Sequence, residues 1–158
     1  MKIGSLIYNL ILALWVGGIV IFTFLVTPVI FQSFGRSTAG EIVGKLFPYY
    51  FPYNLILSVA ALAIFLVFIG IKGKTRGKIT IILLSVAVLS NLFVTFKLNP
   101  DIIGVKQQIK NFEIQSDESP ARNQFRKLHA ISAILNLLLL IDGAVLIILS
   151  NTSKKKEI

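Results

Sequence analysis

One uncharged stretch, residues 5–35, constrains this chain more than any other feature. An α-helix rises about 1.5 Å per residue, and a bilayer core of about 30 Å needs about 20 apolar residues to cross it. The stretch is long enough to cross with tilt. It is longer than the apolar core of a signal peptide, about 7–15 residues, and no small-x-small cleavage site follows it, so we expect a retained first span.

Three further apolar runs follow the first one. Together the predicted spans cover about residues 6–31, 50–71, 79–98 and 128–149. Because lipid cannot satisfy exposed backbone groups, each run is expected to be a helix. Hydrophobic residues make up 55% of the chain and charged residues 15%, which is too apolar for a soluble protein of this size. The sequence therefore predicts an all-α membrane protein, a four-transmembrane-helix bundle forming a single domain over residues 1–158.

The segment after the first span predicts a short interfacial helix. Thr38 and Glu41 have the spacing of a capping box, which places this helix over residues 39–47. Pro48 and Pro52 are expected to end it and redirect the chain. The residues in the position of an aromatic belt are Tyr49, Tyr50 and Tyr53.

Spans three and four are expected to extend as helices beyond the membrane. Apolar residues continue with a roughly helical period at Ile102, Ile103, Val105, Ile109 and Phe112. Ser119 is suited to cap the fourth helix, and Pro120 suits its first position. Lys97 and Asp101 lie one turn apart, which predicts an ion pair at the end of the third span.

The basic residues predict the orientation of the chain. There are 16 Lys and Arg against 7 Asp and Glu, a formal charge of +9. Four cations lie in the link at residues 72–78, and three more lie in a basic tail at residues 150–158. The positive-inside rule places these segments in the cytoplasm, which predicts a multi-pass cell (inner) membrane protein that is N-in and C-in. Because no basic stripe forms a surface of its own, we expect contact with the lipid bilayer and not with nucleic acid.

A small and polar stripe follows one face of the fourth span, formed by His129, Ser132, Ala133, Asn136 and Gly143. Matching depths across the spans extends it into a predicted intramembrane polar cluster of His129, Ser132, Asn136, Asn91, Ser58, Thr23 and Asn54, with Tyr53 beside His129. Amides facing lipid are costly, so the cluster is expected inside the bundle. It serves either close helix packing or the lining of a cavity with His129 near its outer mouth, and the sequence leaves both open.

Asp142 is the one acid deep within a predicted span. It lies about 220° around the helix from His129, at 100° per residue, and so outside the polar stripe. Ser85 or Asn9 is expected to reach this buried acid. A neutral hydrogen-bonded carboxyl and a proton-coupled role both stay open.

Two groups of residues resemble a known family. They are Leu14-Trp15-Val16-Gly17-Gly18 with Pro28, Phe31, Ala39-Gly40, Val43-Gly44 and Leu46-Phe47-Pro48, and, near the other end, Phe125, Leu128, His129, Ser132 and Asn136. Together they resemble the transmembrane-protein-205-like family, also catalogued as domain of unknown function 4149, over nearly the whole chain. The resemblance implies a four-span membrane protein with structural motif residues at Trp15, Gly17, Gly18, Pro28, Gly40 and Gly44. It implies no established biochemistry.

The segment around Trp15 is also similar to the copper-resistance protein D family and to related haem-binding membrane domains. Those domains carry a His a few residues earlier in the helix, where this chain has Tyr8 and Asn9. His129 is then the one His for haem or copper, and a bis-His haem would need two chains.

The sequence gives little support to catalysis. It has no Cys, a single His and no Gly-x-Ser-x-Gly motif, phosphate loop or carboxylate pair, so we expect a protein that is not an enzyme. Three functions stay open. They are a membrane interaction module without a cofactor, a small transporter or permeation accessory that uses the polar cluster, and a haem- or copper-binding domain. A homo-oligomer or another membrane partner is compatible with each.

Overall fold

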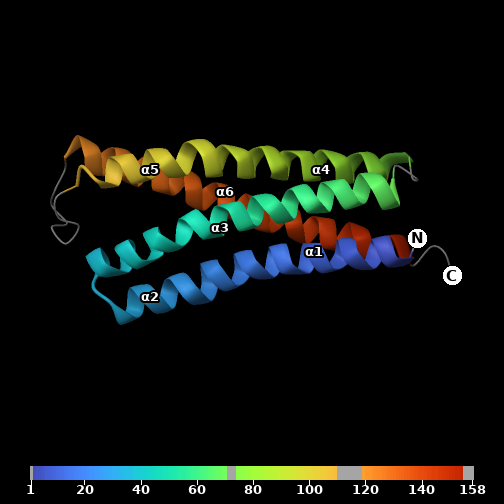
Figure 1. Cartoon of the computed structure of the whole chain (residues 1–158), viewed down its shortest axis with the longest axis horizontal. Helices are drawn as coiled ribbons and strands as arrows, with labels where there is room; N and C mark the ends of the chain where they lie inside the picture. Colours follow the sequence, from blue (N-terminus) through green and yellow to red (C-terminus); the bar gives the residue numbers. More distant parts are fainter. Residues whose placement is uncertain (1, 71–73, 110–118, 155–158) are drawn as a thin grey trace.

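The computed structural model describes residues 2–70, 74–109 and 119–154, and these residues form a bundle of long helices (Figure 1). The first helix consists of α1 (Lys2–Ile21), the π-helical turn η1 (Phe22–Val26) and α2 (Thr27–Ser33); the second of α3 (Arg36–Ile64) and the π-helical turn η2 (Phe65–Ile69). The third consists of α4 (Lys74–Phe93), the π-helical turn η3 (Val94–Leu98) and α5 (Asn99–Lys106), and the fourth is α6 (Pro120–Lys154).

Each of these four helices is long and apolar enough to cross a membrane, over Ile3–Ser33, Arg36–Ile69, Thr75–Lys106 and Pro120–Thr152. The predicted all-α bundle of four spans is therefore confirmed. Large apolar side chains such as Leu66, Ile82 and Leu138 lie exposed on its outer surface, which suits contact with lipid. The predicted limits of the single domain and its tail stay predictions, because residues 71 and 155–158 lie outside the described part.

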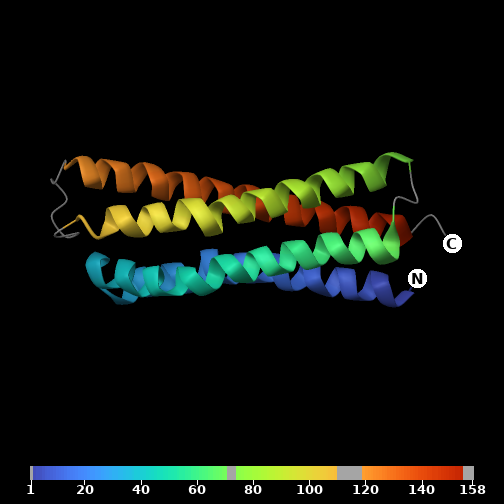
Figure 2. The ribbon, with the colours of Figure 1, turned by 45° about the horizontal axis from the view of Figure 1, so that its top comes forward.

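The helices are arranged as a ring in the order α1, α3, α4 and α6, because α1 and α4 each pack against both α3 and α6. The start of α1 and the end of α6 lie together at one end, which we call the terminal end (Figures 1 and 2). At the opposite end, the hairpin end, α2 turns into α3 and α5 lies against α6. Figure 1 shows the pair α2–α3 standing apart from the pair α5–α6 there.

Close packing of the helices depends on two glycines near the middle of the bundle. A Cβ at Gly143 would lie 2.5 Å from Cγ2 of Val16, and a Cβ at Gly18 would lie 2.6 Å from the ring of Tyr53. The Tyr53 hydroxyl donates a hydrogen bond to the backbone oxygen of Leu14 at 2.7 Å. These glycines therefore allow close approach of helices, as small residues do in membranes. Toward the terminal end the core is closed around three side chains with no exposed area, Leu12, Trp15 and Ile19.

The prediction of a separate interfacial helix over residues 39–47 is wrong. α3 runs from Arg36 through Pro48 and Pro52 to Ile64 as one helix. Each proline removes one backbone hydrogen bond, but leaving the helix would expose several backbone groups to lipid. Proline is tolerated in membrane helices for this reason. The helical period therefore continues unbroken across both prolines and carries Tyr50 into the core.

The predicted capping box is also wrong. α3 has Gly35 as its N-cap and no side-chain cap, so Thr38 already lies inside the helix. Glu41 instead forms an exposed ion pair with Lys45, with 2.8 Å between Oε1 and Nζ. Such a pair one turn apart contributes little to stability.

Other predicted helix ends are confirmed. The third helix continues beyond residue 98 to Lys106, and α6 begins at Pro120, whereas Phe112 lies outside the described residues. The backbone N–H of Arg122 donates to the Ser119 hydroxyl at 3.4 Å. Lys97 and Asp101 form the expected ion pair, with 3.2 Å between Nζ and Oδ2.

Two of the π-helical turns end two residues before a proline. η1 precedes Pro28, with the Thr27 N–H bonded to the Phe22 oxygen, and η3 precedes Pro100, with the Asn99 N–H bonded to the Val94 oxygen. A proline ring clashes with the carbonyl four residues before it, and a wider turn relieves this clash. The family-motif residue Pro28 therefore shapes the helix directly beside the hairpin end.

The two neighbouring glycines of the Trp15 motif give a matched test of this packing. We expect Gly18→Ala to lower the free energy of unfolding by about 1–3 kcal/mol, because the new methyl group displaces Tyr53 from Leu14. Gly17→Ala meets no atom within 4 Å and gains helix propensity, so its stability should be unchanged or higher. Thermal unfolding in detergent measures both, and equal effects of the two variants would contradict this packing.

Candidate functional site

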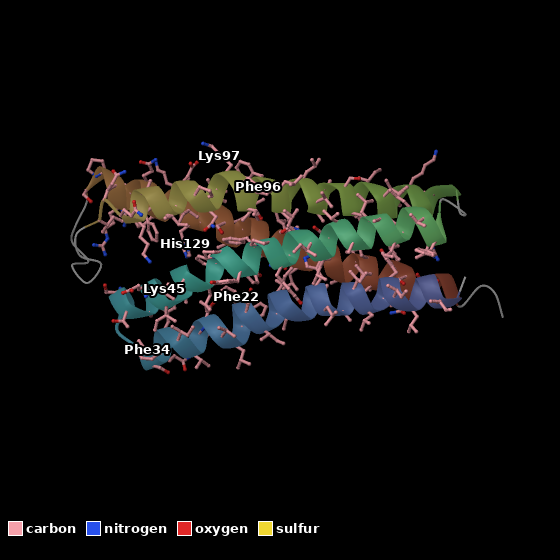
Figure 3. All side chains as sticks on the ribbon, in the orientation of Figure 1. Phe22, Phe34, Lys45, Phe96, Lys97 and His129 are labelled. Atoms are coloured by element: carbon pink, nitrogen blue, oxygen red, sulfur yellow. The ribbon has the colours of Figure 1, made fainter. Side chains whose placement is uncertain are left out.

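A cavity of about 440 Å³ lies between the helix pairs at the hairpin end. Its lining comes from all four long helices. The lining residues are Phe22, Thr23, Thr27, Phe31, Arg36, Ser37, Gly40, Val43, Gly44, Phe47, Tyr50, Phe51, Asn99, Ile102, Ile103, Lys106, Arg122, Phe125, His129, Ser132, Ala133 and Asn136. Phe22 and His129 lie on its two sides, one from η1 and the other from α6 (Figure 3). Small-molecule sites in proteins have volumes of about 300–1,000 Å³, so this cavity is large enough for a ligand.

Aromatic side chains form much of the cavity wall. The rings of Phe22 and Tyr50 stack with centroids 4.0 Å apart, and those of Phe47 and Phe51 stack at 5.0 Å. These rings bury one face against each other and leave an apolar surface for a ligand. The π-helical turn η1 supplies Phe22 to this wall.

A polar knot of three side chains, Thr23, Tyr50 and Asn136, lies at the inner end of the cavity. The Tyr50 hydroxyl donates to Oδ1 of Asn136 at 2.6 Å, and Nδ2 of Asn136 donates to the Thr23 hydroxyl oxygen at 2.8 Å. The knot joins three helices. The closed core around Trp15 lies beyond the knot, toward the terminal end. Because none of the described residues of that core lines the cavity, the cavity ends at the knot.

Three basic side chains line the cavity near the hairpin end. Arg36 begins α3, Lys106 ends α5, and Arg122 lies in the first turn of α6. Arg36 precedes Tyr50 by 14 residues, and Arg122 precedes Asn136 by the same number. At 1.5 Å per residue the basic groups therefore lie about 21 Å from the polar knot. None of the described residues that line the cavity is acidic.

The Lys106 side chain is held against α3. Its Nζ donates to the backbone oxygen of Gly40 at 2.8 Å. A Cβ at Gly44 would lie 2.9 Å from the same Nζ. The family-motif residues Gly40 and Gly44 therefore form a cradle for this ammonium group, a role that their four-residue spacing did not indicate.

Asn99 presents an unpaired polar atom beside the cavity. The residue is 8% exposed and lines the cavity. Its Oδ1 is buried without a hydrogen-bond partner among the described residues.

The structure divides the predicted polar cluster into two groups. Asn136 and Thr23 belong to the knot, whereas Nδ2 of Asn91 donates to the Ser58 hydroxyl at 3.2 Å. Tyr50 and Ser58 are eight residues apart, which is about 12 Å along α3. Asn91, at 2% exposed, and Asn136 both lie inside the bundle, as expected from the cost of placing amides in lipid.

The predicted surroundings of His129 are not found. The His129 ring is exposed and lies parallel to that of Phe125, with centroids 5.8 Å apart. Nδ2 of Asn54 donates to the Tyr50 backbone oxygen at 2.8 Å, and Tyr53 turns toward Leu14. His129 and the buried Ser132 line the cavity without belonging to the polar knot.

Tyr50 is the knot residue that sequence reasoning missed. We expected Tyr50 in an aromatic belt, but it is buried, whereas Tyr49 is 76% exposed. Reading the helix through Pro48 would have placed Tyr50 on one stripe with Asn54 and Ser58. The signal was therefore present but was hidden by the expected helix break.

Asp142 lies apart from the cavity and has no hydrogen-bond partner among the described residues. The expected contact with Ser85 or Asn9 is wrong, because neither carboxylate oxygen of Asp142 has a hydrogen-bond partner among the described residues. The Ser150 hydroxyl donates to Oδ1 of Asn9 instead. Within the described part of the chain, the Tyr8 hydroxyl and the Trp15 indole N–H are also buried without hydrogen-bond partners. Asp142 stays a candidate buried acid with no assigned role.

The described residues contain no group of three His, Asp or Glu side chains that could hold a metal ion. Among these residues, His129 therefore has no further ligands with which to form a copper site. A single imidazole is fewer than the three or four ligands that a metal site normally needs.

The polar knot predicts a measurable coupling between Tyr50 and Asn136. In a double-mutant cycle with Tyr50→Phe and Asn136→Ala, we expect a coupling free energy between about 0.6 kcal/mol, the average for hydrogen bonds inside a membrane protein, and about 1.7 kcal/mol, the largest value. Unfolding by denaturant in detergent micelles measures the four proteins of the cycle. Strict additivity of the two single effects would show that this hydrogen bond contributes nothing.

Comparison with known proteins places the chain in a family. Residues 10–111 match the family described as "Domain of unknown function (DUF4149)". An uncharacterized protein of Aquifex aeolicus is 33% identical over 130 residues, which cover 81% of this chain and 83% of that protein. No solved structure matches the chain. The chain therefore belongs to the DUF4149 family.

Proposed function

We propose that this protein is a non-enzymatic membrane protein that binds a small amphipathic molecule in the cavity at the hairpin end. The observation that carries the proposal is the cavity itself, with aromatic walls between a polar knot and a set of basic side chains. Ligand sites are typically apolar pockets with a few placed polar groups. This proposal makes the predicted interaction module more specific, because it names a binding site.

Binding accounts for the cavity better than permeation does. The cavity reaches four members of the predicted cluster, which are Thr23, His129, Ser132 and Asn136. It does not reach Asn91, which lies beyond the knot with Ser58. A transporter would need a second state that opens the core around Trp15. The resemblances to the transmembrane-protein-205-like and copper-resistance protein D families stay predictions and do not enter this proposal.

We also propose that the protein is N-in and C-in in the cell membrane, so that the cavity opens at the outer face. The support comes from the four cations at residues 72–78. The helix α4, which begins at Lys74, starts at the terminal end. The hairpin end carries basic residues as well, but it also carries Glu41 and Asp101, each in an ion pair.

Labelling of single cysteines tests this orientation, since the chain has no native Cys. A membrane-impermeant maleimide should modify Ser37→Cys in intact cells. It should modify Thr75→Cys only after the membrane is permeabilised. The reverse pattern would place the cavity mouth in the cytoplasm and contradict the proposed orientation.

A neutral fluorophore, N-phenyl-1-naphthylamine, tests the binding site. With protein in phosphatidylcholine nanodiscs and empty nanodiscs subtracted, we expect saturable binding at one site per chain. Gly40→Leu should weaken this binding at least tenfold, because a Cβ at Gly40 meets no atom within 4 Å and a leucine there takes up cavity volume.

Gly104→Leu is the matched control for this variant. Gly104 also has no atom within 4 Å of its Cβ position, but it lies outside the cavity lining. Its affinity for the fluorophore should equal that of the unmodified protein. No saturable binding, or equal loss in both variants, would refute the proposed site.

A further inference from the structure

We infer that the molecule held in the cavity is uncharged at its inner end and carries there a hydrogen-bond donor, an O–H or N–H group, which meets the amide oxygen of Asn99. This inference rests on the proposed function and adds the chemical class and the direction of the ligand. The ligand enters with its polar end first, and its apolar remainder runs along the aromatic wall toward the hairpin end.

Asn99 lies at the depth of the polar knot. Nδ2 of Asn91 on α4 donates to the hydroxyl of Ser58 on α3, and the two helices run in opposite directions. Asn99 follows the first of these residues by eight positions, and Tyr50 precedes the second by eight. Asn99 and Tyr50 therefore lie at about the same level. Leu98 and Tyr50 belong to one buried cluster, which agrees with this register.

Each long helix therefore contributes one polar residue to the inner end of the cavity. We call these residues the polar floor, and they are Thr23, Tyr50, Asn99 and Asn136. Three of them bond one another in the knot, whereas Oδ1 of Asn99 has no partner among the described residues. A buried oxygen without a partner is unfavourable, and a ligand that donates a hydrogen bond to it removes this penalty.

The Asn99 side chain is able to meet such a ligand. The residue is 8% exposed and lines the cavity. Its Oδ1 is buried, but the last torsion of an Asn side chain is broad, so the amide can turn this oxygen toward the cavity.

Two π-helical turns shape the polar floor. η1 contains Thr23, and η3 ends directly before Asn99. One additional residue in a turn rotates the following part of the helix by about 100°, so η3 helps to decide that Asn99 lines the cavity and that Leu98 does not. Such turns occur frequently at functional sites.

The polar floor selects an uncharged group. None of its four side chains carries a charge near neutral pH, so an ion placed among them would lose its hydration without gaining a counter-ion from the floor. The wall beside the floor is aromatic. The ring of Phe22 stacks on that of Tyr50, and the ring of Phe47 stacks on that of Phe51. These surfaces suit an apolar body that extends from a small polar end.

A matched pair of neutral probes separates this inference from the proposed function. 1-Phenoxynaphthalene has the shape of N-phenyl-1-naphthylamine with an oxygen in place of the N–H group, so it cannot donate. Its affinity is measured by displacement of the fluorophore from protein in phosphatidylcholine nanodiscs, with both probes expressed as concentrations in the lipid. We expect N-phenyl-1-naphthylamine to bind about tenfold more tightly. If it shows no saturable binding, the proposed function fails; if the two probes bind equally well, only the donor inference fails.

Asn99→Leu removes the amide and keeps about the same side-chain size. It should weaken binding of N-phenyl-1-naphthylamine about tenfold and leave 1-phenoxynaphthalene within twofold. It should not lower stability, because the lost oxygen has no partner among the described residues. If the variant nevertheless unfolds, the comparison of the two probes in the unmodified protein still decides. Equal weakening of both probes would overturn the inference.

Asn91→Leu is the matched control. Asn91 is also buried, but it is bonded to Ser58 and lies outside the cavity lining. Its replacement should lower stability, because the Ser58 hydroxyl loses its donor, and should leave the ratio of the two probe affinities unchanged. A loss of probe discrimination in Asn91→Leu as large as that in Asn99→Leu would contradict the assignment to Asn99.

Two displacement experiments distinguish a free molecule from a lipid as the source of the donor, with N-phenyl-1-naphthylamine as the readout. 1-Dodecanol is compared with its methyl ether, and dioleoylglycerol in the nanodisc is compared with its acetyl ester. Displacement by either hydroxyl compound, and not by its blocked analogue, supports the inference and identifies the source. Displacement by neither hydroxyl compound, or equal displacement by the blocked analogues, contradicts it.

Discussion

The structure depends on one constraint, which is that backbone groups inside lipid must find their hydrogen bonds within the helix. This constraint explains why α3 continues through Pro48 and Pro52 where a helix in water would be expected to end. It also explains the wider turns η1 and η3 before Pro28 and Pro100, which keep the chain helical beside a residue that lacks an N–H. Prolines in this chain therefore change the shape of the helices without interrupting them.

Side-chain size then decides where these helices touch. Toward the middle and the terminal end, Gly18 and Gly143 let neighbouring helices approach until Tyr53 and Val16 fill the space where a Cβ would be. Toward the hairpin end, phenylalanine rings line a cavity between the helix pairs. The polar knot ties three helices at the boundary between the two regions. The bundle is thus closed at one end and hollow at the other.

The fold could be predicted from the sequence because the length of an apolar run is a local property. The four apolar runs form four helices, as predicted, and Pro120 is the first residue of the last helix. The burial of Asn91 and Asn136 was predictable from the cost of an amide in lipid. The cavity was not, because it depends on the separation of helix pairs, which no single helix encodes. Matching depths across the predicted spans placed Thr23 beside Asn136. It could not show that the cluster divides into two groups, one at Tyr50 and one at Ser58, which are eight residues or about 12 Å apart along α3.

An experimental structure of the protein in a lipid mesophase tests the central claim most directly. The account predicts that α2–α3 and α5–α6 stand apart at the hairpin end, with an elongated ligand or ordered solvent between Phe22 and Phe125 and with the polar knot as its floor. A structure in which α2 packs along α6, so that the aromatic rings fill this space completely, would contradict the account.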